Sequence, residues 1–219
     1  MDAVIAGNLI DMCAVGMLLM SMLAMTTTRI GQLLNAFALQ SLLLAALAFI
    51  VANATGHTEI YLMGIVTVAV KVITIPWFMR YTTARIKTGR EVDSNIGIPA
   101  SLLLSAVLIM ISYFVTDPLV DSLGTITRNC LALSMSVILI GLFMMVTRRK
   151  AMTEAVGLLM MENGLFLGVM SISYGMPLIV ELGIFFDVLM AVVIIGIFAL
   201  RISKTFDSID TSFMRRLKD

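Results

Sequence analysis

Long apolar runs cover most of this chain and limit what it can fold into. Each run is about twenty residues long, the length that an α-helix needs to cross a hydrocarbon core of about 30 Å. Backbone groups in lipid must be satisfied internally, and no alternating barrel pattern is visible, so helices are expected. The runs cover residues 3–25, 30–52, 59–81, 96–115, 126–146, 151–172 and 176–202. With 60% hydrophobic and only 13% charged residues, the sequence predicts an all-α, polytopic membrane protein with seven transmembrane helices.

Basic residues fall between alternate pairs of these runs. The loops on one side and the C-terminal tail hold Arg29, Arg80, Arg85, Lys87, Arg90, Arg148, Arg149, Lys150, Arg201, Lys204, Arg215, Arg216 and Lys218, whereas the other loops hold only Arg128. Lys and Arg are enriched in the cytoplasmic loops of membrane proteins. We therefore expect the N-terminus outside the cell and the C-terminus in the cytoplasm.

Four polar side chains lie near the middle of the expected helices. They are Gln40, Lys71, Glu162 and Asp187, each about 15 Å from either membrane face at about 1.5 Å rise per residue. A charge at that depth costs about 2.5 kcal/mol or more, so such residues are usually functional. These groups are candidates for a proton or ion path. Asn163, beside Glu162, and Glu181, nearer the outer end of the last helix, are further candidates.

The carboxyl and amine groups in this set offer proton chemistry, because burial in a low dielectric favours their neutral forms. Glu162 and Asp187, in neighbouring antiparallel helices, can pass a proton through water or a rotating side chain. The alternative is two neutral carboxyls that hold the helices together by hydrogen bonds. Lys71 either switches between its charged and neutral forms or makes a static ion pair with a Glu, within the chain or in another subunit.

The remaining candidates have similar alternatives. Gln40 either bridges waters or makes an interhelical hydrogen bond, and Glu181 is either the mouth of a path to Asp187 or a solvated cap. Pro76 is expected to kink its helix and free a carbonyl near Val72, either as a partner for the Lys71 amine or as a purely structural kink. Small residues allow helices to approach closely, and Gly157, Gly164 and Gly168 are expected to do so near Glu162.

Similar features in the two halves indicate an internal repeat. Arg29 precedes its helix as Arg149 does, Gln40-Ser41 falls where Glu162-Asn163 falls, and Gly64-Ile65 falls where Gly183-Ile184 falls. Two three-helix units of parallel orientation would result, joined by the fourth helix. This divides the chain into an N-terminal unit (1–84), a cytoplasmic linker with the connecting helix (85–125), and a C-terminal unit with a short cytoplasmic tail (126–219).

Few side chains in the sequence can bind a redox centre. Cys13 and Cys130 lie in different helices and His57 lies in an outer loop, which is too little for an iron–sulfur cluster, a structural zinc site or a haem with two histidine ligands. We therefore expect no cofactor, no metal site and no catalytic residue in this chain. No glycine-rich phosphate loop or basic soluble module favours nucleic-acid binding.

The last third of the chain resembles a known family. A three-helix unit with Glu162 in its second helix and Asp187 in its third is similar to the NuoK-type subunit of complex I and to its MrpC-type relatives in antiporters. Asp187 matches a position that usually holds Glu, so that match is by charge alone. The stretches 160–164 and 180–187, with Lys71 and Pro76 earlier in the chain, more closely resemble hydrogenase-4 component E.

This resemblance implies a role that the spacing does not show. It implies a subunit of a complex I-like or group 4 hydrogenase-type complex in the prokaryotic cytoplasmic (inner) membrane. Such a subunit lies beside antiporter-like membrane subunits, a membrane anchor subunit and soluble redox subunits, and contributes to proton translocation coupled to electron transfer. Nickel–iron and iron–sulfur centres would lie in those partners, so the chain would be a non-catalytic part of an oxidoreductase. The alternatives are a subunit of a redox-independent Mrp-type antiporter and a structural scaffold bundle.

Overall fold

A computed structural model describes residues 3–85, 96–123 and 128–173, with residues 183, 190, 191, 193 and 194. Every regular element in these ranges is helical. The elements are α1 (Ala3–Thr26), α2 (Ile30–Thr55), α3 (Thr58–Thr67), the π-helix η1 (Val68–Thr74), α4 (Ile75–Arg85), α5 (Ile98–Leu123), α6 (Arg128–Thr147) and α7 (Ala151–Ser173). Because α3, η1 and α4 follow one another without a break, they form one long helix.

The first six apolar runs of the sequence therefore form helices, as predicted. Five of the described helical stretches, from Ala6–Thr26 to Cys130–Thr147, are long and apolar enough to cross a membrane by length and composition. The seventh run, 176–202, lies almost entirely outside the described residues.

The turn between α2 and α3 is set by residues at the ends of the two helices. Helix α2 ends at Gly56, which has a φ of 74° and donates its N–H to the carbonyl of Ala52 at 2.8 Å. Glycine adopts this left-handed conformation without the penalty that a Cβ atom brings. Glu59 lies in the first turn of α3, where a carboxylate is favoured by the helix dipole.

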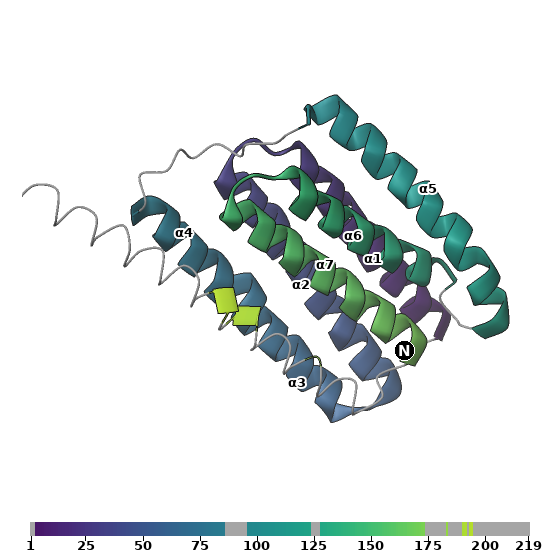
Figure 1. Cartoon of the computed structure of the whole chain (residues 1–219). Helices are drawn as coiled ribbons and strands as arrows, with labels where there is room; N and C mark the ends of the chain where they lie inside the picture. Colours follow the sequence, from purple (N-terminus) through teal and green to yellow (C-terminus); the bar gives the residue numbers. More distant parts are fainter. Residues whose placement is uncertain are drawn as a thin grey trace, which may run out of the picture.

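Helices α1, α2, α6 and α7 form the centre of the bundle, with α1 packed on α6 and α2 packed on α7. The long α3–η1–α4 helix lies against α2, while α5 lies at the edge of the bundle against α6 and α1 (Figure 1). The outer helix α5 exposes large apolar side chains, such as Phe114 at 84%. An apolar exterior is what contact with lipid tails requires.

The closest packing joins α6 to α7 through glycine. A Cβ atom on Gly141 would lie 2.7 Å from the backbone nitrogen of Met161, and one on Gly164 would lie 2.9 Å from the backbone nitrogen of Ile138. Gly157 and Gly168 face α6 in the same way. The prediction that the glycines of α7 allow close approach of a neighbouring helix is confirmed, and the glycine of α6 contributes to the same contact.

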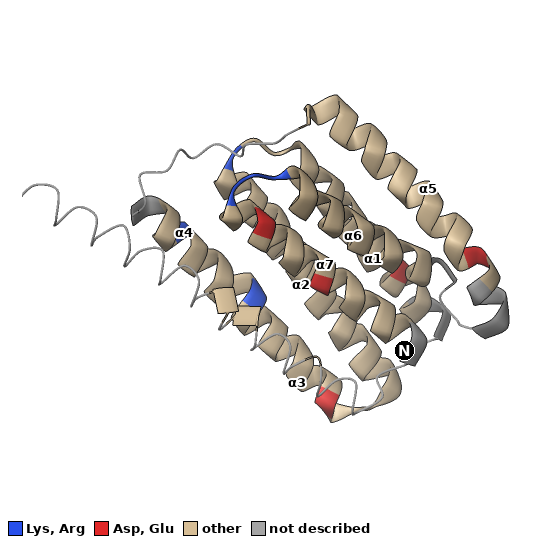
Figure 2. Cartoon of the chain, in the orientation of Figure 1, with Lys and Arg blue, Asp and Glu red and all other residues tan. Residues whose placement is uncertain are grey.

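Basic residues lie where α1 joins α2 and where α6 joins α7 (Figure 2). Arg148 at the end of α6 reaches across to α1, where its Nη2 donates to the carbonyls of Met25 at 2.8 Å and Ala24 at 3.4 Å. The two loops therefore lie at the same end of the bundle. This agrees with the grouping of the basic loops that the sequence predicts. Arg148 itself is only 5% exposed, because its side chain caps the C-terminal end of α1.

Candidate functional site

The π-helix η1 carries the side chain of Lys71 into the bundle. Pro76 has no N–H to donate, so the normal helical ladder cannot continue through it. The backbone N–H of Ile75 donates instead to Val70, five residues earlier, and the hydroxyl of Thr74 donates to the carbonyl of Ala69 at 2.7 Å. The structure shows a wider turn directly before Pro76, whereas the expected kink and the freed carbonyl near Val72 stay predictions. Such π-turns occur often at functional sites.

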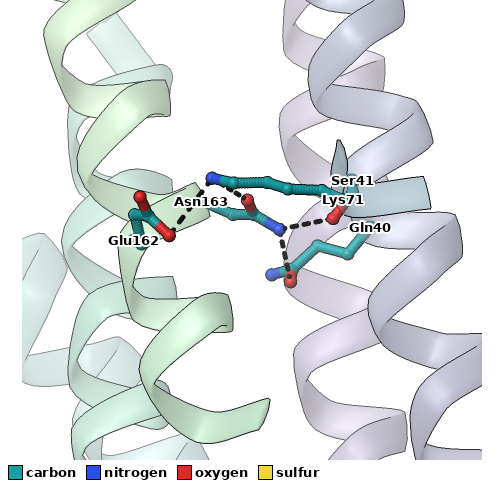
Figure 3. Close-up of polar contacts among 5 residues, drawn as sticks. All are labelled: Gln40, Ser41, Lys71, Glu162 and Asn163. Carbon is teal, nitrogen blue, oxygen red and sulfur yellow. Dashed lines mark hydrogen bonds and ion pairs between the residues drawn. The ribbon is translucent and has the colours of Figure 1, made fainter. Parts of the chain in front are cut away.

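Three side chains of α7 surround the Lys71 ammonium. Its Nζ atom donates to Oδ1 of Asn163 at 3.0 Å and lies 3.4 Å from Oε2 of Glu162 (Figure 3). The same Nζ lies 4.8 Å from the centre of the Phe166 ring, within the range of a cation–π contact. Lys71 is 0% exposed and Glu162 is 4% exposed. The ion pair is therefore enclosed between η1 and α7.

A chain of hydrogen bonds continues from Asn163 into α2 and α1. Nδ2 of Asn163 donates to Oγ of Ser41 at 3.0 Å and to Oε1 of Gln40 at 3.3 Å (Figure 3). Nε2 of Gln40 then donates to Oγ of Ser21 at 2.9 Å, which donates to the carbonyl of Met17. We call these six side chains the buried polar network: Ser21, Gln40, Ser41, Lys71, Glu162 and Asn163. All six are buried.

Each amide in the network has a fixed orientation. Because both described contacts of the Asn163 amino group are to oxygen atoms, its amide oxygen faces the ammonium. Gln40 is oriented in turn, since its oxygen accepts from Asn163 and its nitrogen donates to Ser21. Amide groups do not ionise near neutral pH, so Lys71 and Glu162 are the members of this network that can exchange a proton.

The structure brings together four of the six residues that the sequence marks as a proton path. Gln40, Lys71, Glu162 and Asn163 are in direct or successive contact, although α2, η1 and α7 are far apart along the chain. Asp187 and Glu181 lie outside the described residues, so the expected relation between Glu162 and Asp187 remains a prediction.

Sequence reasoning did not find two contributors to the site. Ser21 has no distinguishing signal, because serines are common in membrane helices and usually bond to their own backbone. Phe166 could have been found, because it lies four residues after Glu162 and so on the same helical face. Among the described residues, no group of three His, Cys, Asp or Glu side chains is placed to hold a metal ion.

The fold and this site define an all-helical membrane protein with a Lys–Glu ion pair buried between its helices. No family model and no solved structure matches the chain. It is 32% identical over 212 residues to the Mycobacterium tuberculosis protein named Uncharacterized protein Rv0085, with 96% of both chains covered.

It is also 25% identical over 182 residues to Hydrogenase-4 component E of Escherichia coli strain K12, with 83% of this chain and 84% of the relative covered. The same values hold for Hydrogenase-4 component E of Shigella flexneri. The chain belongs to the family of Rv0085, and it is similar to hydrogenase-4 component E over most of its length. The resemblance seen in its sequence is thereby confirmed.

Proposed function

We propose that this chain is an integral membrane subunit of a hydrogenase-type, complex I-like complex, and that its buried Lys71–Glu162 pair takes part in proton translocation. Electron transfer would occur in partner subunits. The observation that carries the proposal is the ion pair itself, fully enclosed in the bundle and held by residues from α2 and α7. Intramembrane ionisable pairs of this kind mark ion and proton pathways.

The chemistry of the pair suits a proton carrier. Transfer of one proton from the Lys71 ammonium to the Glu162 carboxylate converts two opposite charges into a neutral amine and a neutral carboxylic acid. In a low dielectric the two states can lie close in energy, because the neutral state avoids the cost of burying two charges. A small change in the surroundings, such as a charge arriving in a neighbouring subunit, can then shift the balance.

The packing also supports a two-unit organisation. In the proposed repeat, α1 and α6 are the first helices of the two units, and α2 and α7 are the second helices. Helix α1 packs against α6, and α2 packs against α7, so equivalent helices of the two units are in contact. Two units related by a pseudo-twofold axis along the membrane normal would make such contacts. We include in the proposal seven transmembrane helices, an outer N-terminus and a location in the prokaryotic inner membrane.

The decisive experiment compares Glu162→Gln with Glu154→Gln in the assembled complex. Both changes remove one carboxylate from α7, but Glu154 lies in its first turn. Proton uptake by proteoliposomes is expected to fall at least about tenfold in Glu162→Gln and to stay near the parent value in Glu154→Gln. Equal uptake by parent and Glu162→Gln would favour a scaffold role, since Gln keeps the size and hydrogen bonding of Glu.

The chains that co-purify with this protein test whether it is a subunit of a redox-coupled complex. Recovery with iron–sulfur and nickel–iron subunits supports a redox-coupled complex. Recovery with antiporter-like subunits alone, and proton exchange that needs no electron donor, would identify a subunit of a redox-independent antiporter instead.

A further inference from the structure

The ammonium of Lys71 occupies a position that a free cation could fill. It is bound by the amide oxygen of Asn163 at 3.0 Å and the carboxylate of Glu162 at 3.4 Å. Two more neutral oxygens, those of Gln40 and Ser41, lie directly behind Asn163 and fix the direction of its amide. Carboxylate and amide oxygens, such as those of Glu162 and Asn163 beside the ammonium, are ligands that hard cations prefer.

We propose that the position between Oδ1 of Asn163 and Oε2 of Glu162 is a site for a monovalent cation such as Na⁺, and that Lys71 keeps it filled with its own ammonium. A free Na⁺ is thereby excluded, and the proton is the cation that the pair can exchange. The inference rests on the proposed function only in naming which ion moves. The site itself follows from the geometry around Nζ.

Charge is the first reason for the exclusion. The Glu162 carboxylate and the Lys71 ammonium sum to zero, so a second cation beside Lys71 would give this pair a net positive charge in a low dielectric, which is costly. A proton avoids this penalty. When the ammonium gives its proton to Oε2 of Glu162, one N–H bond breaks, one O–H bond forms, and the total charge does not change.

Space is the second reason. Lys71 and Asn163 are 0% exposed, and the Phe166 ring covers the ammonium at 4.8 Å. The cation position is therefore enclosed by protein atoms while Lys71 remains extended. Because the lysine is covalently attached, its ammonium competes at a high effective concentration with any free ion.

Replacing Lys71 tests the cation site by thermal unfolding, without a measurement of proton transport. Thermal unfolding of the full chain in detergent is measured in NaCl and in choline chloride at equal ionic strength. The parent is expected to unfold at the same temperature in both salts. Lys71→Ala and Lys71→Ser are expected to gain about 2–4 °C in NaCl at concentrations well above the dissociation constant, because Na⁺ binds only the folded state. The double variant Lys71→Ala, Glu162→Gln is expected to lose this gain.

Each outcome of this experiment either supports or overturns the proposed cation site. A Na⁺-dependent gain in the parent would show that Lys71 does not fill the site, and the absence of a gain in both single variants would show that the oxygens do not bind Na⁺. If both single variants misfold in choline, their recovery in NaCl supports the proposal, and misfolding in both salts overturns it. Failure of proton uptake to depend on Glu162 would contradict the proposed function while leaving this binding result intact.

Discussion

The Nζ atom of Lys71 lies 3.0 Å from Oδ1 of Asn163, although 92 positions separate these residues in the sequence. This hydrogen bond joins the α3–η1–α4 helix to α7, and therefore joins the two halves of the proposed repeat. The position that corresponds to Asn163 in the first half is Ser41, which Asn163 also contacts. The buried polar network thus lies where the two halves meet.

The Lys71–Glu162 pair is expected to show strong energetic coupling. Removing one partner of a buried ion pair leaves an uncompensated charge and costs about 3–5 kcal/mol. Lys71→Met and Glu162→Leu should each lower the free energy of unfolding by about this amount, whereas the double variant, which buries no charge, should lose much less than the sum. Additive losses in a double-mutant cycle, measured by denaturation in detergent, would show that the two charges do not interact.

Asn163 is expected to contribute more to the stability of the folded chain than Ser41. Asn163→Leu leaves the oxygen of Gln40 without its donor and the ammonium without an amide acceptor, which should cost about 1–3 kcal/mol of stability. Ser41→Ala removes one of two acceptors of the Asn163 amino group, and the bond to Gln40 remains. A loss below about 1 kcal/mol is therefore expected for Ser41→Ala. A larger loss in Ser41→Ala than in Asn163→Leu would contradict this account of the network.

Arg148 provides a test at the other end of the bundle. It is buried, and this burial lowers the pKa of its guanidinium, although arginine remains charged at neutral pH. Because it caps the carbonyls of Ala24 and Met25, Arg148→Ala should cost about 1–3 kcal/mol. Its exposed neighbour is the matched control, and Arg149→Ala should change stability by less than about 1 kcal/mol. Equal thermal stability of the two variants would refute the capping role.

Hydropathy predicts the helices of this chain because each helix must satisfy its own backbone in lipid. The same reasoning predicts that Gln40, Lys71 and Glu162 are buried, since their depth leaves them no water. It does not predict which helices touch, because apolar side chains on all of them suit many neighbours equally well. The sequence therefore left the partner of Lys71 open between a carbonyl near Val72 and a Glu in this chain or another subunit.

Glycine packing offers a matched pair of substitutions. Gly141→Ala places a Cβ atom 2.7 Å from the backbone nitrogen of Met161, which cannot move without shifting α7, so a loss of about 1–3 kcal/mol is expected. Gly31→Ala meets no atom within 4 Å and should be neutral or stabilising by up to about 1 kcal/mol, because alanine favours a helix. Thermal unfolding in detergent measures both, and equal losses would contradict the packing described for α6 and α7.

The π-turn before Pro76 gives a test of what positions Lys71. Pro76→Ala restores an N–H that can donate one turn earlier, so the helix can return to regular α geometry. Losing the extra residue of a π-turn rotates the helix before it by about 100° relative to the helix after it, which would turn Lys71 away from α7. Proton uptake by the assembled complex should therefore fall, and thermal stability should fall as well, because the buried Glu162 loses its ion-pair partner. Pro118→Ala in α5 makes the same substitution inside another helix and should leave uptake unchanged, so an equal effect of the two variants would show that the π-turn does not position Lys71.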